Sequence, residues 1–326
     1  MHKIKDFSLW CDFIERDFLK GEFIKLLERK TFNGVTTNPS IFKLAFLTSE
    51  AYKKERDNLK NTDTKNIYEK LAIEDIKIAA TTMQKLYKND NDGFVSIEVD
   101  PNICDDEKAT IKESKRLFNE IGFENVMIKI PATKAGYKAM EELMFDGIHV
   151  NATLVFSPNQ AKSCIEAFQR AKERLKGDKK LPKGVISVFV SRFDSKLDNK
   201  LKNINLEVSK TGIFNAMKIY DLIETYKLPN IRTLFASTGV KNDSLEKDYY
   251  IKSLLFKNSI NTAPLEAIKS FIKSGDWVEI TPSKEYIKYF QKLDKHGIDM
   301  QNVYDELFQD ALKAFKDAFK EILNEL

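Results

Sequence analysis

Short apolar runs alternate with helix-like segments along most of this chain. Eight runs have the length and composition of buried strands, and we expect strands at Ser8–Asp12, Gly34–Thr37, Phe94–Asp100, Val126–Ile130, Ile148–Phe156, Gly184–Val190, Ile231–Ala236 and Tyr250–Phe256. Helical periodicity predominates between them, at Glu22–Leu27, Asn66–Tyr87, Asp106–Glu120, Ala135–Asp146, Pro158–Lys176, Leu201–Tyr226 and Leu245–Asp248. Strands that alternate with helices form parallel sheets, and eight such units predict an α/β fold of the (β/α)8 TIM-barrel type.

Two parts of the chain contain more residues than eight strand–helix units need. The stretch from Asn38 to Gly93 is longer than one crossover needs, so we expect an extra helix there. After the eighth strand the pattern is helical, and the last segment carries the apolar stripe Val303, Leu307, Ala311, Phe315, Phe319 and Ile322. The stripe predicts a helix that packs on the barrel; a helix that binds a partner or forms a dimer is the alternative. We expect one domain over residues 1–326, with 265–326 as a helical C-terminal extension packed on it.

Composition and charge argue against several classes of protein. The 326 residues carry 53 Lys+Arg against 49 Asp+Glu, and the interleaved signs argue against a nucleic-acid or membrane surface while allowing a local phosphate site. Cys11, Cys104 and Cys164 are too far apart to suggest a disulfide framework or a zinc cluster. No stretch approaches the ~20 apolar residues of a membrane span, and the N-terminus lacks the apolar core of a signal peptide. We therefore expect a cytoplasmic protein, either a monomer or a homodimer.

Lys129 lies inside the apolar run Val126–Pro131, where a lysine is unexpected. Desolvating an ammonium group is costly, but burial is tolerated when the amine loses its proton. A neutral amine is a nucleophile toward carbonyl groups, so this position favours covalent chemistry. The alternative is an edge strand from which Lys129 points into solvent.

Polar residues stand near the carboxyl ends of seven expected strands, which in a barrel line the mouth of the active site. They are Asp12, Thr36, Asn38, Glu98, Lys129, Asn151, Thr153, Ser187, Arg192 and Ser237. Because a buried unpaired hydroxyl or amide costs roughly 2–7 kcal/mol, packing alone does not explain such a ring. It contains one lysine and two carboxylates, the groups that Schiff-base chemistry on a carbonyl substrate needs.

Other chemistries lack the residues that they require. His2, His149 and His296 are too scattered for a metal site or a Ser-His-Asp triad. Neither a G-x-x-x-x-G-K-[ST] motif nor a G-x-G-x-x-G motif after a strand is present, so nucleotide cofactors have no support. We expect no metal and no cofactor.

Several motifs, taken in order, resemble those of the transaldolases. The signature segments are Gly34–Ser40 (GVTTNPS), Ile128–Thr133 (IKIPAT) and Asn151–Phe156 (NATLVF), and further matches are Leu9–Asp12, Glu98–Asp100, Ser187–Arg192, Phe235–Asn242 and Asn261–Pro264. The segment Leu293–Leu323 resembles the helical tail of the longer-chain bacterial branch. Val188, Ser191 and Ala152 depart from the common pattern.

The resemblance implies a cofactor-free transfer of a dihydroxyacetone unit between sugar phosphates in the pentose phosphate pathway. The donor would be sedoheptulose 7-phosphate or fructose 6-phosphate, and the acceptor an aldose phosphate. By motif position, the catalytic residues would be Lys129 as the Schiff-base lysine, Asp12 as the acid/base at the C4 hydroxyl, and Glu98 with Thr153 at the catalytic water. The substrate-binding residues would be Thr36, Asn38, Asn151, Ser187 and Ser237, with Arg192 and Lys241 at the phosphate.

Two other functions remain open from the sequence. One is an aldolase of the same fold that cleaves fructose 6-phosphate without an acceptor; Glu98 favours the transferase, since related simple aldolases resemble this chain but carry an aromatic residue there. The other is a catalytically silent barrel that binds sugar phosphates or a protein partner. The presence of Lys129, Asp12 and Glu98 together argues against it.

Overall fold

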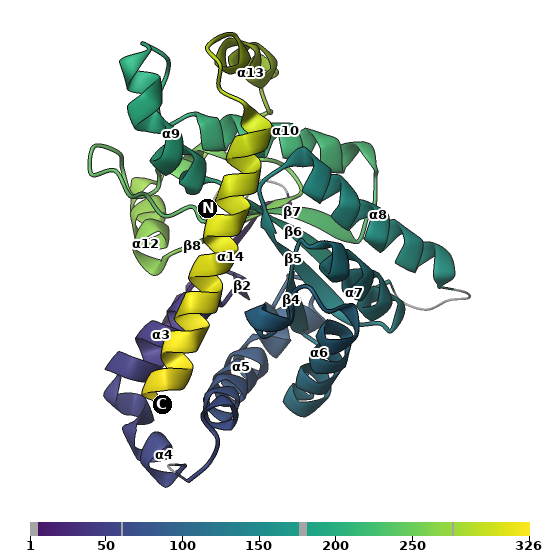
Figure 1. The fold of residues 1–326 in the computed structure, drawn as a ribbon. Coiled ribbons are helices and arrows are strands. Elements are labelled where there is room, and N and C mark those ends of the chain that lie inside the picture. The colour runs from purple at the N-terminus through teal and green to yellow at the C-terminus, as the bar shows by residue number, and fades with distance from the viewer. Residues whose placement is uncertain (1–5, 60, 176–180, 276) are drawn as a thin grey trace.

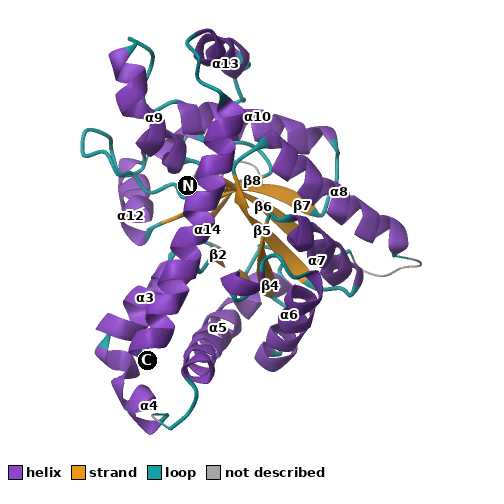
Figure 2. Cartoon of the chain, in the orientation of Figure 1, coloured by secondary structure: helices purple, strands orange, loops and turns teal. Residues whose placement is uncertain are grey.

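The computed structural model describes residues 6–59, 61–175, 181–275 and 277–326. Its strands are β1 (Ser8–Cys11), β2 (Gly34–Val35), β3 (Phe94–Glu98), β4 (Val126–Pro131), β5 (His149–Val155), β6 (Gly184–Phe189), β7 (Ile231–Ala236) and β8 (Ser259–Ala263). They form a closed parallel barrel in chain order, with β8 paired to β1. The predicted (β/α)8 barrel is confirmed (Figure 2).

Helices surround this barrel and extend beyond it (Figure 1). Those before β8 are α1 (Arg16–Lys20), α2 (Glu22–Glu28), α3 (Pro39–Thr48), α4 (Lys53–Asn58), α5 (Thr64–Lys88), α6 (Glu107–Ile121), α7 (Lys134–Phe145), α8 (Pro158–Arg174), α9 (Ser191–Asn203), α10 (Thr211–Thr225) and α11 (Tyr249–Ser253), with 3-10 turns η1 (Glu50–Tyr52) and η2 (Pro101–Ile103). After β8 come α12 (Leu265–Ser274), α13 (Glu285–Lys295) and α14 (Met300–Glu325). The extra helical structure expected between β2 and β3 is present as α3, η1, α4 and α5, and Lys176, the expected end of one helix, lies outside the described residues.

The eighth strand lies nearer the C-terminus than predicted. The expected strand Tyr250–Phe256 falls largely in α11, and the strand that closes the barrel is β8. β8 reads Ser-Ile-Asn-Thr-Ala, which is polar for a buried strand. Its Asn261 and Thr262 side chains are buried. Asn261 Oδ1 accepts from the Thr238 hydroxyl at 2.9 Å and the Thr262 hydroxyl lies 2.6 Å from that of Thr36, while the Asn261 amide nitrogen has no hydrogen-bond partner among the described residues. The expected helix Leu245–Asp248 is also wrong, because these residues form turns that lead into α11.

The single helix predicted over Leu201–Tyr226 is two helices, α9 and α10. In the loop between them Asn205 and Ser209 have positive φ angles of 55° and 56°, which helical residues do not adopt. The backbone N–H and the hydroxyl of Ser209 both donate to the Asp198 carboxylate, at 2.8 and 2.9 Å. These local hydrogen bonds replace the helical ones and hold the loop.

Close packing of β1 on β2 depends on a glycine. Trp10, fully buried on β1, is the register partner of Gly34 on β2. A Cβ atom at position 34 would overlap the indole ring, so no larger residue fits without moving Trp10. The Trp10 Nε1–H donates to Asp92 at 2.9 Å. The pair fixes the start of the barrel on the side away from the strand ends that carry the polar ring.

The apolar stripe of the last helix is buried, as predicted. All six of its residues lie in α14, and each is less than one tenth exposed. α14 has more contacts with α3 than with any other element, and it also contacts α5, η2, β5 and α9. Of these, α3, η2 and α9 follow the carboxyl ends of β2, β3 and β6. In Figure 1 this helix passes across the strands instead of joining the outer ring. No helix of the described residues is long and apolar enough to cross a membrane.

Candidate active site at the carboxyl end of the barrel

Lys129 is buried in the barrel, with 5% of its surface exposed. It stands on β4 directly in register with Glu98 on β3 and with Asn151 on β5. Neighbours in register on parallel strands direct their side chains to the same face, so these three share one wall of the interior. The Lys129 amine donates to the Thr37 carbonyl at 2.8 Å and lies 3.3 Å from Glu98 Oε2. The alternative of an edge-strand lysine in solvent is excluded by this burial.

Glu98 is a buried carboxyl group with an ion pair but without good hydrogen bonds. Its exposure is 6%, and within the described part of the chain neither carboxylate oxygen has a partner of hydrogen-bond geometry. The contact with Lys129 is therefore an ion pair at an unfavourable angle. Burial raises the pKa of Glu98 to about 7, against the positive charge of Lys129, which lowers it. A carboxyl group with this pKa exchanges its proton readily near neutral pH.

Asp12 follows β1 and belongs to a second hydrogen-bonded group. Its Oδ1 accepts from the Thr36 hydroxyl at 2.6 Å, and Thr36 in turn lies 2.6 Å from the Thr262 hydroxyl on β8. Loss of hydration raises the pKa of Asp12, while the charge of Lys129 and the Thr36 hydrogen bond act in the opposite direction. Asp12 lies at the end of β1, and its partner Thr36 also contacts Thr262 on β8, so the carboxylate lies within the ring of strand ends. Asp12 and Glu98 are thus two carboxyl groups, from different strands, on which the charge of Lys129 acts.

A row of hydroxyl and amide groups crosses the barrel beside Lys129. Ser187 on β6 donates to Asn151 Oδ1 at 2.6 Å, and Asn151 Nδ2 donates to the Ser96 hydroxyl on β3 at 3.1 Å. Thr153, two residues after Asn151, has a fully buried hydroxyl that finds no hydrogen-bond partner among the described residues. Because an unsatisfied buried hydroxyl costs about 1–3 kcal/mol, its place here is better explained by a ligand or water than by folding.

The cations predicted for a phosphate lie at the rim. Arg192 is in the first turn of α9, half-buried, and desolvation lowers its pKa. Lys241, in the segment after β7, is exposed, and its pKa is lowered by partial desolvation and by the positive charge of Arg192. The two loops are joined by Ser191 and Ser237: the Ser191 N–H donates to the Ser237 carbonyl at 3.0 Å, and the hydroxyls lie 3.2 Å apart. Two cations at one rim raise the positive potential there.

Asn38 is the N-cap residue of α3, a structural role that was not predicted from the sequence. Its Oδ1 accepts from the Ile41 N–H at 3.1 Å and caps α3, which begins at Pro39. The amide nitrogen is the part of this side chain left for a ligand.

Besides Ser96, which accepts from Asn151, three further groups at the site were not predicted as site residues. They are the Thr37 carbonyl, which receives the lysine hydrogen bond, Thr262, which completes the Asp12 group, and Phe315 of α14. The Phe315 ring centroid is 5.7 Å from Lys129 Nζ. Thr262 stands in the strand that was misplaced, so its pairing could not be anticipated. The burial of Phe315 as a stripe residue is confirmed, but an apolar stripe in the sequence does not indicate which part of the barrel the helix covers.

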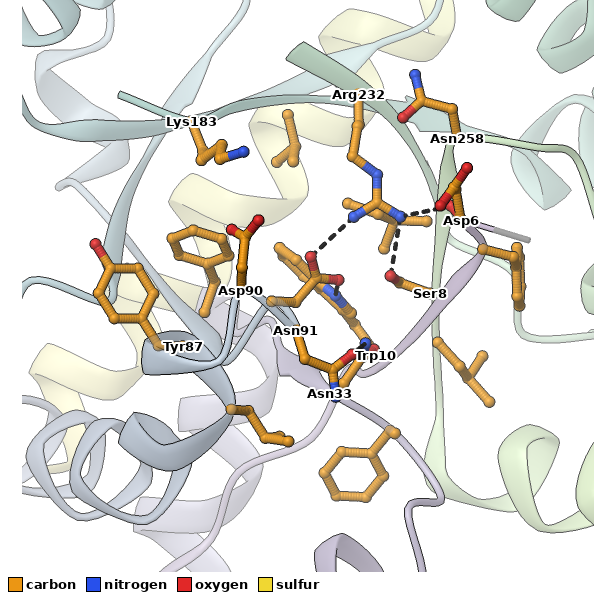
Figure 3. Close-up of a pocket in the computed structure, with 18 of the residues that line it drawn as sticks. Asp6, Ser8, Trp10, Asn33, Tyr87, Asp90, Asn91, Lys183, Arg232 and Asn258 are labelled. Atoms are coloured by element: carbon orange, nitrogen blue, oxygen red, sulfur yellow. Dashed lines mark hydrogen bonds and ion pairs between the residues drawn. The ribbon is translucent and has the colours of Figure 1, made fainter. Parts of the chain in front are cut away.

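A large cavity lies at the opposite end of the barrel. It measures about 870 Å³, and Figure 3 shows Trp10, Arg232 and Asn33 among its lining residues. None of the predicted site residues lines it. Arg232 is engaged in protein contacts there, with Asp92 at 2.8 Å and with Ser8 Oγ at 2.9 Å. The amino-terminal face of such barrels generally serves stability, so we place the chemistry at the carboxyl end.

A parallel (β/α)8 barrel with a buried lysine and two carboxylates at its carboxyl end defines the class of lysine-dependent aldolases. Comparison with known proteins narrows the class. The sequence model of the family Transaldolase/Fructose-6-phosphate aldolase matches residues 9–326. The transaldolase of Campylobacter jejuni subsp. doylei is 47% identical over 331 residues, covering 99% of this chain and 100% of that one. The transaldolase of Helicobacter pylori (strain P12) is 44% identical over 323 residues, covering 98% and 99%. The chain belongs to the transaldolase/fructose-6-phosphate aldolase family.

Proposed function

We propose that this protein is a transaldolase of the pentose phosphate pathway, which moves a dihydroxyacetone unit from a ketose phosphate to an aldose phosphate. The observation that carries the proposal is the buried Lys129 amine, which donates to the Thr37 carbonyl at 2.8 Å and lies 3.3 Å from Glu98. A packing role does not require a buried lysine with a carboxylate that lacks hydrogen bonds, since replacing a buried ion pair by well-packed apolar residues is often neutral or stabilising. Covalent chemistry requires both.

The first half of the reaction forms and cleaves a Schiff base. Lys129 passes a proton to Glu98, and its free amine adds to the C2 carbonyl of the donor. Glu98 then returns the proton to the departing oxygen, so water leaves and an iminium ion forms. Asp12, ionised at this stage, takes the proton of the C4 hydroxyl. The C3–C4 bond breaks, its electrons neutralise the iminium as an enamine, and the shortened aldose departs. The raised pKa of Asp12 makes it a stronger base than an exposed aspartate.

The second half reverses these steps with a different aldehyde. The enamine C3 attacks the acceptor carbonyl, and Asp12 returns its proton to the new hydroxyl. Water then hydrolyses the iminium and frees Lys129. Glu98, whose pKa of about 7 allows it to give and take a proton, serves the water steps together with the Thr153 hydroxyl. The carboxylates thus act on different bonds of one substrate.

Substrate binding is assigned to the remaining polar groups. Asn151, Ser187, Thr36 and the Asn38 amide would hold sugar hydroxyls, because hydroxyl and amide groups at fixed positions recognise polyols by paired donors and acceptors. Arg192, with Lys241 and Ser237, would hold the phosphate at the rim. The planar guanidinium suits bidentate bonding to phosphate oxygens.

Borohydride trapping with fructose 6-phosphate tests the proposal. Reduction of the iminium leaves a stable adduct, and peptide mass mapping should place it on Lys129. Lys129→Arg should form no adduct and show no activity, because guanidinium stays protonated. Lys134→Arg, at an exposed position on α7, is the matched control and should retain both the borohydride adduct on Lys129 and the activity. An adduct on another lysine, or none, would refute the proposal.

The alternative within the family is an aldolase that releases dihydroxyacetone instead of transferring it. Glu98 at its position favours transfer, and the assay is the yield of transfer product against free dihydroxyacetone. A silent barrel, the remaining alternative, would bind the donor sugar phosphate without forming a borohydride adduct.

The three free cysteines are all buried, as a reducing compartment permits, and the cytoplasm remains our prediction for the location.

A further inference from the structure

The C-terminal helix α14 lies across the carboxyl end of the barrel, over the site. It has 26 residues, roughly 39 Å of helix, and starts with a cap in which Asp299 accepts from the Gln301 N–H at 2.8 Å. Its contacts reach α3 after β2, η2 after β3, and α9 after β6 (Figure 1). The helix therefore spans the mouth from the loop that carries Thr36 and Thr37 to the helix that begins beside Arg192.

The middle of α14 presents Phe315 to the reactive lysine. Phe315 is 4% exposed and Lys129 is 5% exposed, so the two side chains face each other away from solvent. The centroid of the ring is 5.7 Å from Nζ. A carbon bonded to Nζ on this side, at about 1.5 Å, comes to the contact distance of about 3.5–4.0 Å from ring atoms. No water layer fits between that carbon and the ring.

Polar contacts hold α14 on both sides of Phe315. Tyr304 donates to the buried Asn215 Oδ1 at 3.0 Å, and Lys196 of α9 pairs with Glu306 at 2.8 Å. Toward the C-terminus, Glu321 pairs with Lys43 of α3. Exposed ion pairs contribute little to stability, so the buried apolar stripe holds the helix and the pairs fix its register.

We propose that Phe315 is the ceiling of the active site and determines whether the three-carbon unit is transferred to an aldehyde or lost to water. This inference rests on the proposed function. The enamine is destroyed when C3 takes up a proton, a water oxygen adds to C2 and the C2–N bond breaks; one water molecule is consumed and dihydroxyacetone leaves. A ring against the bound carbons keeps bulk water from that side, while Glu98 and Thr153 retain the water that normal turnover uses.

The position also suits the iminium intermediate electronically. The face of an aromatic ring attracts a cation within about 6 Å, and the iminium charge sits on the C2–N bond that Phe315 would contact. The ring thus favours the covalent intermediate in two ways, by attracting its charge and by excluding water. Neighbouring stripe residues do not share this place: Phe319, one turn on, packs edge-on against Tyr68 at 5.0 Å between centroids.

The test compares Phe315→Ala and Phe315→Leu with the matched control Phe319→Leu. Each variant receives fructose 6-phosphate with and without erythrose 4-phosphate, and two rates are measured: transfer to the acceptor and release of free dihydroxyacetone. The ratio of release to transfer should rise about tenfold or more in Phe315→Ala, less in Phe315→Leu, and stay near the wild-type value in Phe319→Leu. Phe315→Leu keeps most of the side-chain volume in the core, so the ratio of release to transfer can be measured in this variant even if Phe315→Ala does not fold.

Three outcomes separate the possibilities. An unchanged ratio in folded Phe315→Leu and Phe315→Ala, or an equal rise in Phe319→Leu, would overturn the inference. If the alanine variant does not fold, an unchanged ratio in Phe315→Leu overturns it alone. Absence of a borohydride adduct at Lys129 in the wild-type protein would instead contradict the proposed function, so the two failures are distinguishable.

Discussion

Glu98 should make the stability of this protein fall as pH rises through the neutral range. Its carboxyl has an ordinary pKa of 4.5, and burial raises that value to about 7 in the folded protein. Below pH 4.5 the group is protonated in both the folded and the unfolded state. Between these values the unfolded chain loses the proton while the folded protein keeps it, so the free energy of unfolding decreases with pH. A difference of one between the folded and unfolded pKa values corresponds to about 1.4 kcal/mol, so the loss by pH 8 is on the order of 3 kcal/mol.

Urea unfolding of the wild type and of Glu98→Gln at pH 4.5 and pH 8 measures this effect. The amide does not titrate, so any effect that it has on packing or on the Lys129 contact is present at both pH values and cancels in the comparison. The wild type should lose on the order of 3 kcal/mol relative to Glu98→Gln between the two conditions. The control Glu279→Gln, at an exposed position, should stay within about 0.5 kcal/mol of the wild type at both. A wild-type-to-Glu98→Gln difference that does not change with pH would refute the reasoning.

Three further outcomes follow from the site and from the packing beneath it. Asp12→Ala should still give the borohydride adduct but lose turnover by about 10²–10⁴-fold, since only C–C cleavage needs this base; equal loss of trapping would contradict it. Arg192→Ala should raise KM for fructose 6-phosphate strongly while barely changing the slow reaction of free fructose, and a uniform loss on both sugars would mean that Arg192 supports the fold. Gly34→Ala should lower the free energy of unfolding by about 1–3 kcal/mol in urea titration, because its Cβ overlaps Trp10; an unchanged midpoint would show that the indole yields freely.

Much of the fold followed from the sequence because barrel strands are apolar on both faces. Seven of the eight strands were located, including the run around Lys129, since apolar side chains face both the helices and the barrel core. β8 was missed because two consecutive residues, Asn261 and Thr262, carry polar side chains that are typical of loops in the sequence but are hydrogen bonded to neighbouring elements in the structure. The apolar residues of Tyr250–Phe256 were mistaken for a strand because short apolar runs do not distinguish a strand from a short helix.

The candidate site was predictable to the extent that each residue is anomalous where it stands. Lys129 and Glu98 are charged residues in apolar strands, and this contrast is visible without coordinates. Asn38 is a polar residue before a proline, for which a helix cap and a ligand contact look the same in the sequence. Phe315 is the opposite case, because an aromatic residue in an amphipathic stripe is in its ordinary place. Its role depends on which surface the helix covers, and that is set by long-range packing.

The C-terminal helix α14, which is additional to the (β/α)8 barrel, also affects the chemistry of the site. Desolvation is the main cause of the raised pKa of Glu98, and α14 closes the end of the barrel at which Glu98 lies. We expect a barrel without this helix to expose the carboxyl to water, which would return its pKa toward 4.5 and keep it ionised at neutral pH. The ring of Phe315 and the proton exchange at Glu98 therefore have one physical origin, the exclusion of solvent by a single apolar stripe. In this protein the stability gained by burying the stripe is inseparable from the low-dielectric site in which an amine and two carboxylates can act.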